Sequence, residues 1–218
     1  MKKVISLSLA LALSFVVFSQ EVMKEGIIIS KQTMSSDNEQ MKAQLAMMGE
    51  MESITYFKGA KTRAELSNPM SGNVTTITDA ETKETLTLMD NLAMGKKYML
   101  QKTEITDEQL DKITVVVGDK TKTVLGYECK QYIVTMNEEA GAIEMELYTT
   151  ESIPVATQQL AMVGNKLKGF PLYMTVKINQ MGSVMIITTE VTEIKREAVS
   201  DDKFDMTPPE GYEKMSKQ

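Results

Sequence analysis

Short runs of alternating apolar and polar residues occupy most of the chain between residues 26 and 195. Successive side chains of a strand point to opposite faces, so this alternation predicts half-buried antiparallel strands. About eleven such runs favour a mainly β protein with one curved antiparallel sheet or unclosed β-barrel. The runs cover residues 26–34, 52–58, 61–66, 73–79, 83–90, 97–102, 113–117, 127–136, 142–149, 172–180 and 183–195.

Three segments break the alternation and indicate a few helices. Residues 36–39 read Ser-Asp-Asn-Glu, which fits a capping box with Ser36 as the N-cap. Behind this box, Met41, Leu45 and Met48 fall on one helical face. The sequence therefore predicts an amphipathic helix directly after the first strand.

The other two helical segments follow later in the chain. Thr106 begins a second, weaker capping box that predicts about one turn of helix. In residues 154–168, apolar residues recur at helical spacing, and Gly169 follows them. The apolar stripe of this third helix consists of Ala156, Leu160, Val163 and Leu167.

A curved sheet that does not close has a concave apolar face that needs a cover. We expect two or three helices to lie across that face. Because they are too few to fill a wide trough, the sequence predicts an apolar cavity between sheet and helices. The candidate lining residues come from the two longer helices: Met41, Leu45, Met48, Leu160, Val163 and Leu167.

Residues 1–19 have the layout of a secretory signal peptide. Lys2 and Lys3 precede an apolar run, and Ser19 offers a small residue at the cleavage point. The run is shorter than the roughly 20 residues of a membrane span. We therefore expect a periplasmic or secreted protein of a Gram-negative envelope, without a transmembrane anchor after cleavage. Residues 20–218 are expected to form a single β-rich domain with a C-terminal tail from about residue 200.

The residue types that carry most enzyme chemistry are missing. The chain has no histidine and one cysteine, so catalytic triads and His-ligated metals are excluded. No glycine-rich phosphate-binding motif is present. A net charge of −6 disfavours nucleic acid as a partner. We expect no enzyme activity, no metal and no cofactor.

Two sulfur-containing residue types need separate interpretation. Cys129 shares its strand face with Tyr127, which is typical of a small buried hydrophobe rather than a reactive thiol. The chain also has 19 methionines and no tryptophan. These methionines fill gaps in a core, form an adaptable apolar lining, or hold copper(I) as thioether ligands, and the sequence leaves the three alternatives open.

Two motifs carry a resemblance to a known group. Residues 126–132 read Gly-Tyr-Glu-Cys-Lys-Gln-Tyr, and residues 204–212 read Phe-Asp-Met-Thr-Pro-Pro-Glu-Gly-Tyr. They resemble the Gly-Tyr-x-Cys-x-x-Tyr strand and the Phe-x-x-Pro-x-Gly-Tyr ending of a secreted envelope family of unknown function. That family is related to the LolA-like periplasmic lipoprotein carriers. The resemblance implies an unclosed barrel with helices over an apolar cavity. The arginines that carriers use for cargo transfer have no positional match, because the chain has only Arg63 and Arg196.

These observations lead to one functional hypothesis and one alternative. The first is a non-enzymatic protein that binds a lipid or an acyl chain in its cavity. The alternative is an envelope structural or interaction protein with a filled core, whose protein partners dock along an exposed strand edge.

Overall fold

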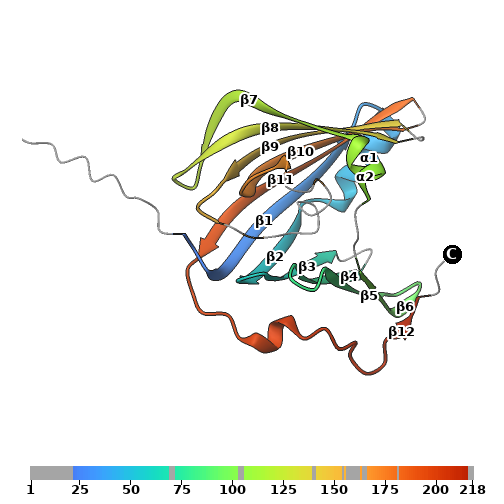
Figure 1. Ribbon diagram of the computed structural model, residues 1–218. Helices are drawn as coiled ribbons and strands as arrows, with labels where there is room; N and C mark the ends of the chain where they lie inside the picture. The colour runs from blue at the N-terminus through green and yellow to red at the C-terminus, as the bar shows by residue number, and fades with distance from the viewer. Residues whose placement is uncertain are drawn as a thin grey trace, which may run out of the picture.

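One twelve-stranded sheet dominates the part of the chain that the structure describes (Figure 1). The computed structural model describes residues 22–68, 72–102, 106–138, 141–153, 155, 163, 166–180 and 182–215. The strands are β1 (Glu25–Ser36), β2 (Met51–Lys58), β3 (Lys61–Asn68), β4 (Gly72–Asp79), β5 (Glu84–Asn91), β6 (Gly95–Lys102), β7 (Ile113–Val124), β8 (Tyr127–Glu138), β9 (Gly141–Thr150), β10 (Phe170–Gln180), β11 (Ser183–Lys195) and β12 (Glu213–Lys214).

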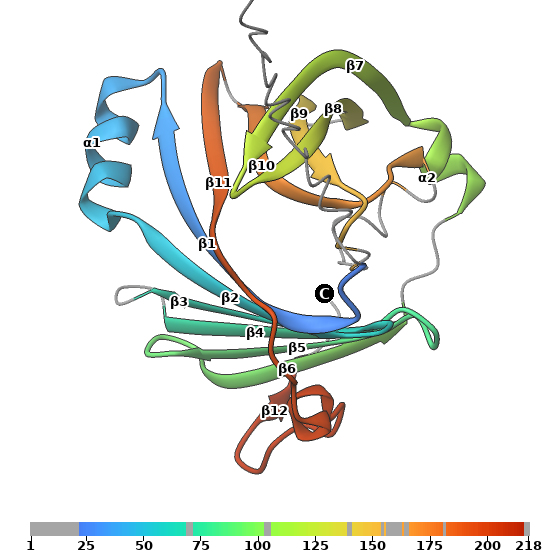
Figure 2. The ribbon, with the colours of Figure 1, turned by 90° about the vertical axis from the view of Figure 1, so that its left-hand side faces the viewer.

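The strand order is β12-β6-β5-β4-β3-β2-β1-β11-β10-β9-β8-β7. One antiparallel meander runs outward from β1 to β6, and a second returns from β7 to β11, which pairs with the other side of β1. Among the described strands, only the short β12 is parallel to its neighbour, β6. Figure 2 shows the resulting curved sheet, whose two halves face each other without joining. The mainly β, unclosed antiparallel fold predicted from the alternation is confirmed, and each of the eleven predicted strands is present.

The two described helices lie at one end of the sheet, on opposite sides of it (Figures 1 and 2). Helix α1 (Glu39–Met48) connects β1 to β2, and helix α2 (Asp107–Asp111) precedes β7. Neither helix contains a buried residue. They therefore do not cover the concave face as expected. Most of the third predicted helix, at 154–168, lies outside the described residues.

The helix caps agree with the sequence in one case only. Thr106 and Gln109 form the expected capping box at the start of α2. At α1 the N-cap is Asn38, whose Oδ1 accepts hydrogen bonds from the N–H groups of Gln40 and Met41. Ser36 is still paired in β1, and its hydroxyl donates to the Val184 carbonyl. The prediction of Ser36 as the N-cap was wrong because the strand extends to that residue.

Two apolar clusters pack against the half of the sheet that contains β7–β11. The first brings together the start of β1, the end of β2 and the β7–β8 turn. Its buried members are Met23, Ile28, Phe57, Val124, Tyr127, Cys129, Ile153, Val155, Phe170, Leu172 and Val191. The second packs Val163 and Leu167 on the inner face of β7–β9, together with Ile113, Tyr132, Val134, Met136 and Leu147.

A third apolar cluster lies on the convex face of β1–β6 and is covered by residues 196–215, which we call the strap. Buried Ile77, Leu86 and Leu88 of the sheet pack with Val199 and Phe204 of the strap. Phe204 belongs to a short 3-10 helix, η2 (Asp201–Phe204). Figure 2 shows the strap crossing below β1–β6 and ending at β12. The expected C-terminal tail is therefore a packed element up to residue 215.

Polar contacts also hold the strap to the sheet. The Lys58 ammonium lies 2.8 Å from the Asp201 carboxylate and donates to the Val199 carbonyl at 3.2 Å. At the far end, the Met215 N–H donates to the Tyr98 carbonyl at 2.8 Å. Because the groups at Lys58 and Asp201 are exposed, their ion pair is worth little. Burial of Val199 and Phe204 supplies most of the strap's contribution to stability.

Replacing Phe204 with alanine tests this role of the strap. We expect the Phe204→Ala variant to lose about 3 kcal/mol of unfolding free energy, because the change removes a buried aromatic ring and leaves a cavity. Leu92→Ala is the matched control, since Leu92 is fully exposed and its truncation should change stability by less than about 0.5 kcal/mol. Urea unfolding measures the unfolding free energy of both variants. Equal losses would contradict the stabilising role of the buried Phe204 ring.

Candidate ligand-binding cavity

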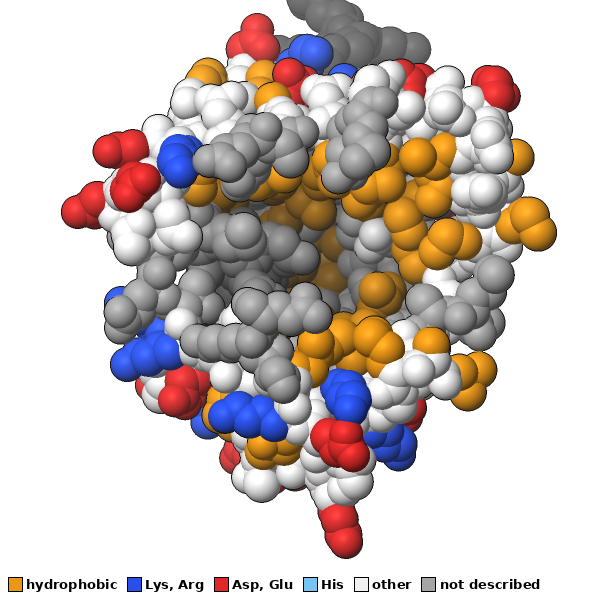
Figure 3. All heavy atoms as spheres, turned by 90° about the vertical axis from the view of Figure 1, so that its right-hand side faces the viewer, with side chains coloured by type: hydrophobic (Ala, Val, Ile, Leu, Met, Phe, Trp, Pro, Cys, Tyr) orange, Lys and Arg blue, Asp and Glu red, His pale blue; other side chains and the backbone are white. Residues whose placement is uncertain are grey.

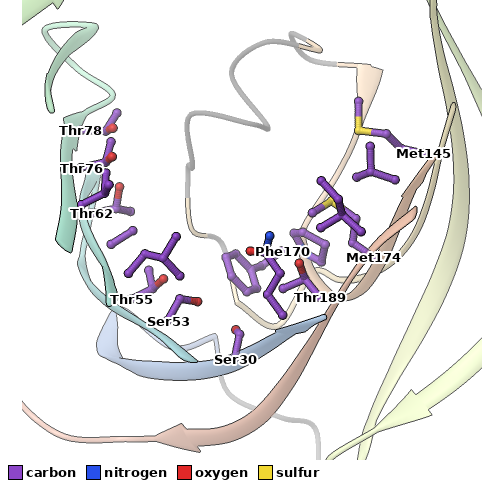
Figure 4. A pocket seen from close by; sticks show the side chains of 17 residues that line it. Ser30, Ser53, Thr55, Thr62, Thr76, Thr78, Met145, Phe170, Met174 and Thr189 are labelled. Carbon is purple, nitrogen blue, oxygen red and sulfur yellow. The ribbon is translucent and has the colours of Figure 1, made fainter. Parts of the chain in front are cut away.

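A cavity of about 410 Å³ lies between the two halves of the sheet. Viewed from the end that carries α1 and α2, the molecule shows a hollow with hydrophobic side chains on its wall (Figure 3). Figure 4 shows residues from both halves pointing into it. The described lining residues are Ser30, Gln32, Ser53, Thr55, Thr62, Ala64, Leu66, Val74, Thr76, Thr78, Met145, Phe170, Pro171, Met174, Val176, Ile187 and Thr189.

One wall of the cavity comes from β2, β3 and β4. The register pairs Thr55 with Ala64, and Ala64 with Thr76, so these side chains lie in one row across three strands. A neighbouring row pairs Thr62 with Thr78. Residues one position away, such as Ile77, point to the convex face and pack under the strap. The period of two therefore places most of the hydroxyl groups of β2–β4 inside, together with the apolar Ala64, Leu66 and Val74, and places Ile77 outside.

The opposite wall comes from β9, β10 and β11 and is largely apolar. Register pairs Met145 with Val176, and Val176 with Ile187, which gives one row across these strands. Met174 lies in the next row and faces the cavity as well. Two methionines thus belong to the described lining, and the adaptable-lining alternative stays a prediction. Both pack against the buried cluster that contains Val163 and Leu167.

Phe170 lies deep in the cavity and is positioned by the residue before it. Gly169 has a φ of +79°, a left-handed conformation that favours glycine. A Cβ atom at Gly169 would lie 2.4 Å from the Thr150 carbonyl oxygen, which belongs to the backbone of β9. Close approach of the two backbones therefore requires glycine, and it sets the start of β10 and the place of the Phe170 ring.

The lining residues that the sequence predicted lie elsewhere or beside the cavity. On α1, Met41 is exposed, and Leu45 and Met48 are half-buried, away from the described lining. Leu160 lies outside the described residues. Val163 and Leu167 are buried next to the apolar wall, in contact with its cluster but not in the described lining.

The hydroxyl-bearing wall was missed. Its only sequence signal is the polar half of the alternation in residues 73–79, which is also compatible with a solvent-facing side. The sequence does not indicate which side of the sheet is concave.

A polar cluster on the opposite, outer face of β8–β10 is satisfied by its own members. The Glu146 carboxylate accepts hydrogen bonds from the Gln131 amide at 2.6 Å and from the Tyr148 hydroxyl at 3.0 Å, and both bonds lower the pKa of Glu146. The Lys122 ammonium lies 3.2 Å from the centre of the Tyr173 ring. These contacts stabilise the outer face of the sheet and leave the carboxylate occupied.

Other sites considered from the sequence give no chemical centre within the described ranges. No group of three or more His, Cys, Asp or Glu residues there is arranged to hold a metal ion. Met47 is 79% exposed whereas Met51 is buried, so the two thioethers do not share one environment. None of the helices in the described part of the chain is long and apolar enough to span a membrane. The predicted signal peptide, residues 1–19, lies outside that part.

No family model and no curated protein matches the sequence. Among solved structures, the fold is similar to PNGF-II in two crystal forms, with 16% and 15% identity and TM-scores of 0.47 and 0.44. The matches cover 88% and 87% of this chain but only 31% of the PNGF-II chain. The lipoprotein LppX of Mycobacterium tuberculosis matches 82% of this chain and 90% of its own, with 4% identity and a TM-score of 0.34. The expected membership of the secreted envelope family therefore stays a prediction.

Substitution of Gly169 tests how the cavity is positioned. We expect Gly169→Ala to destabilise the protein by more than about 2 kcal/mol, because backbone strain adds to a clash with Thr150. Gly182→Ala is the matched control: it has a φ of +78° but no atom within 4 Å of the added Cβ, so only the strain, about 1 kcal/mol, applies. Thermal or urea unfolding compares the two, and an equal loss would contradict the close approach.

Cys129 should behave as an inert core residue. It is fully buried, its thiol donates to the Tyr127 carbonyl at 3.6 Å, and burial raises the pKa of the thiol to about 11. Roughly one thousandth of the thiol is ionised at pH 8, so we expect negligible reaction with an aromatic disulfide reagent in the folded protein. The same reagent should titrate one thiol in urea. Fast stoichiometric labelling without urea would contradict the burial of Cys129.

Proposed function

We propose that this protein binds a hydrophobic ligand, a lipid or an acyl chain, in the cavity between the two halves of its sheet, without catalysing a reaction. The cavity and its apolar wall of Met145, Met174, Val176 and Ile187 carry the proposal. Transfer of an acyl chain from water to such a wall is worth about 0.8 kcal/mol for each CH₂ group buried. Unbranched methionines allow the wall to adapt to chains of different shape.

The absence of acid–base groups supports binding over catalysis. None of the described residues that line the cavity titrates near neutral pH. A general acid or base must lie within hydrogen-bond reach of the reacting atoms. The described lining offers hydroxyl groups, one amide, thioethers and hydrocarbon, which can hold and orient a ligand.

A second function rests on the edge strand β7. No strand pairs with its outer side in the described part of the chain. Val116 and Val117 are exposed there, and Val116 is paired in register with the exposed Ile133 of β8. An unpaired edge beside exposed apolar side chains suits a partner that adds a strand. This is the interaction function, and it requires no ligand in the cavity.

Filling the cavity distinguishes the two functions. We expect the purified full-length chain to carry a lipid in native mass spectrometry and to enhance the fluorescence of N-phenyl-1-naphthylamine, an uncharged apolar probe. Ala64→Phe adds a ring from the cavity wall, so we expect its affinity for the probe to fall at least tenfold. Ala80→Phe is the control, because Ala80 lies in an exposed turn and the ring adds no bulk to the cavity.

Two negative results together would contradict ligand binding. Bare polypeptide in native mass spectrometry, together with no probe uptake by the unsubstituted chain, would contradict ligand binding and favour the interaction function. Urea unfolding of the Ala64→Phe and Ala80→Phe variants checks that the added ring has not simply unfolded the protein.

A further inference from the structure

The two walls of the cavity differ in chemistry. Hydroxyl groups from β1–β4 line one side, and carbon and sulfur atoms from β9–β11 line most of the other (Figure 4). The hydroxyl wall comprises Ser30, Ser53, Thr55, Thr62, Thr76 and Thr78. The same wall also carries the Gln32 amide and the apolar Ala64, Leu66 and Val74, so it is mixed, whereas the opposite wall is largely apolar.

Most hydroxyl groups on this wall lack a side-chain hydrogen-bond partner among the described residues. Ser30 and Thr62 are only 6% and 4% exposed, and both line the cavity. No hydrogen bond joins their hydroxyls, or that of Thr76, to any described group. Thr78 is different, because its Oγ1 lies 3.4 Å from that of Thr85. A ligand that covers these hydroxyls without offering them hydrogen bonds carries a desolvation cost, so a ligand with polar groups of its own is favoured.

Charge is absent from the same surface. None of the described lining residues is Lys, Arg, Asp or Glu. An ionised group moved from water to such a site is strongly disfavoured unless an opposite charge is present. The carboxylate of a free fatty acid finds no cation among these residues, whereas an uncharged polar group pays no such cost.

We propose that the ligand is an uncharged amphiphile whose oxygen-bearing side faces the hydroxyl wall. This inference rests on the proposed function, which requires that a ligand be taken up in the cavity. Its hydrocarbon packs on the Met145–Ile187 side of the cavity, and its hydroxyl or carbonyl oxygens exchange hydrogen bonds with Thr62 and Thr76. Neutral acylglycerols and neutral glycolipids have this chemistry. Free fatty acids and bare hydrocarbons do not.

Three compounds with the same acyl chain test the proposal: monodecanoylglycerol, methyl decanoate and decanoate. Each displaces N-phenyl-1-naphthylamine from the full-length chain at pH 8, where the carboxylic acid is ionised. We expect half-displacement by monodecanoylglycerol at a concentration at least ten times lower than by decanoate, with methyl decanoate in between. Equal potency of monodecanoylglycerol and decanoate would overturn the proposal.

A pair of isosteric substitutions tests the hydroxyl wall directly. In the Thr62→Val/Thr76→Val variant, we expect the advantage of monodecanoylglycerol over methyl decanoate to shrink at least threefold, because the two hydroxyls assigned to the ligand are lost. Thr75→Val is the matched control: Thr75 neighbours Thr76 on β4 but points to the convex face, so the advantage should persist. An unchanged ratio in the double variant would overturn the assignment of the wall.

The outcomes separate this inference from the proposed function. If the probe does not bind the unsubstituted chain, ligand binding itself fails and the inference falls with it. If the probe binds but the three compounds compete equally, only the inference fails. If the double variant does not fold, the comparison of the three compounds on the unsubstituted chain still tests whether the ligand is an uncharged amphiphile.

Discussion

One half of the sheet buries the face that points away from the cavity, and this constraint shapes the rest of the molecule. In β1–β6 the apolar residues Ile77, Leu86 and Leu88 lie on the convex side under the strap. A strand has only two faces, so the concave side of the same strands receives the residues between them, including Thr76 and Thr78. In β9–β11 the concave side is instead largely apolar, with Met145, Val176 and Ile187, and the outer face carries the Glu146 cluster. The two walls of the cavity therefore differ, because one half of the sheet buries apolar residues on its convex face and the other half buries them on its concave face.

The strands were predictable because their signal is local. Alternation with a period of two located all eleven long strands of the described part of the chain, and the two-residue β12 was missed. The face that becomes concave is not a local property, since residues 73–79 alternate in the same way whichever side is turned inward. The contact between the strap and the sheet decides which face is convex, and the sequence does not reveal it. Phe204 lies more than a hundred residues from Ile77 in the chain, and no periodicity connects the two.

The helices show why an apolar stripe does not establish a cover. Met41, Leu45 and Met48 do share one face of α1, yet the helix lies at the end of the sheet and buries none of them. The N-cap of α1 is Asn38 and not the predicted Ser36, because pairing with β11 keeps Ser36 in the strand. Tertiary pairing therefore overrode two predictions that local spacing supported.

The motifs behind the family resemblance have structural roles in this chain. Gly126 has a φ of +81° in the turn between β7 and β8, and Tyr127 and Cys129 are buried just after it. In the second motif, Phe204 is the buried residue of the strap, and Tyr212 packs at the edge of the same cluster. These residues build a hairpin and hold the strap, so their pattern indicates the scaffold and leaves the ligand unspecified.

Because the strap buries its apolar residues on the convex side, the folding stability of β1–β6 and the chemistry of the cavity depend on different residues of the same strands. Exchange of one inward-facing side chain for another of similar size leaves the Phe204 contacts untouched. Related chains could thus acquire new ligand preferences by changing alternate positions of β2–β4, while the intervening positions and the C-terminal segment preserve the architecture.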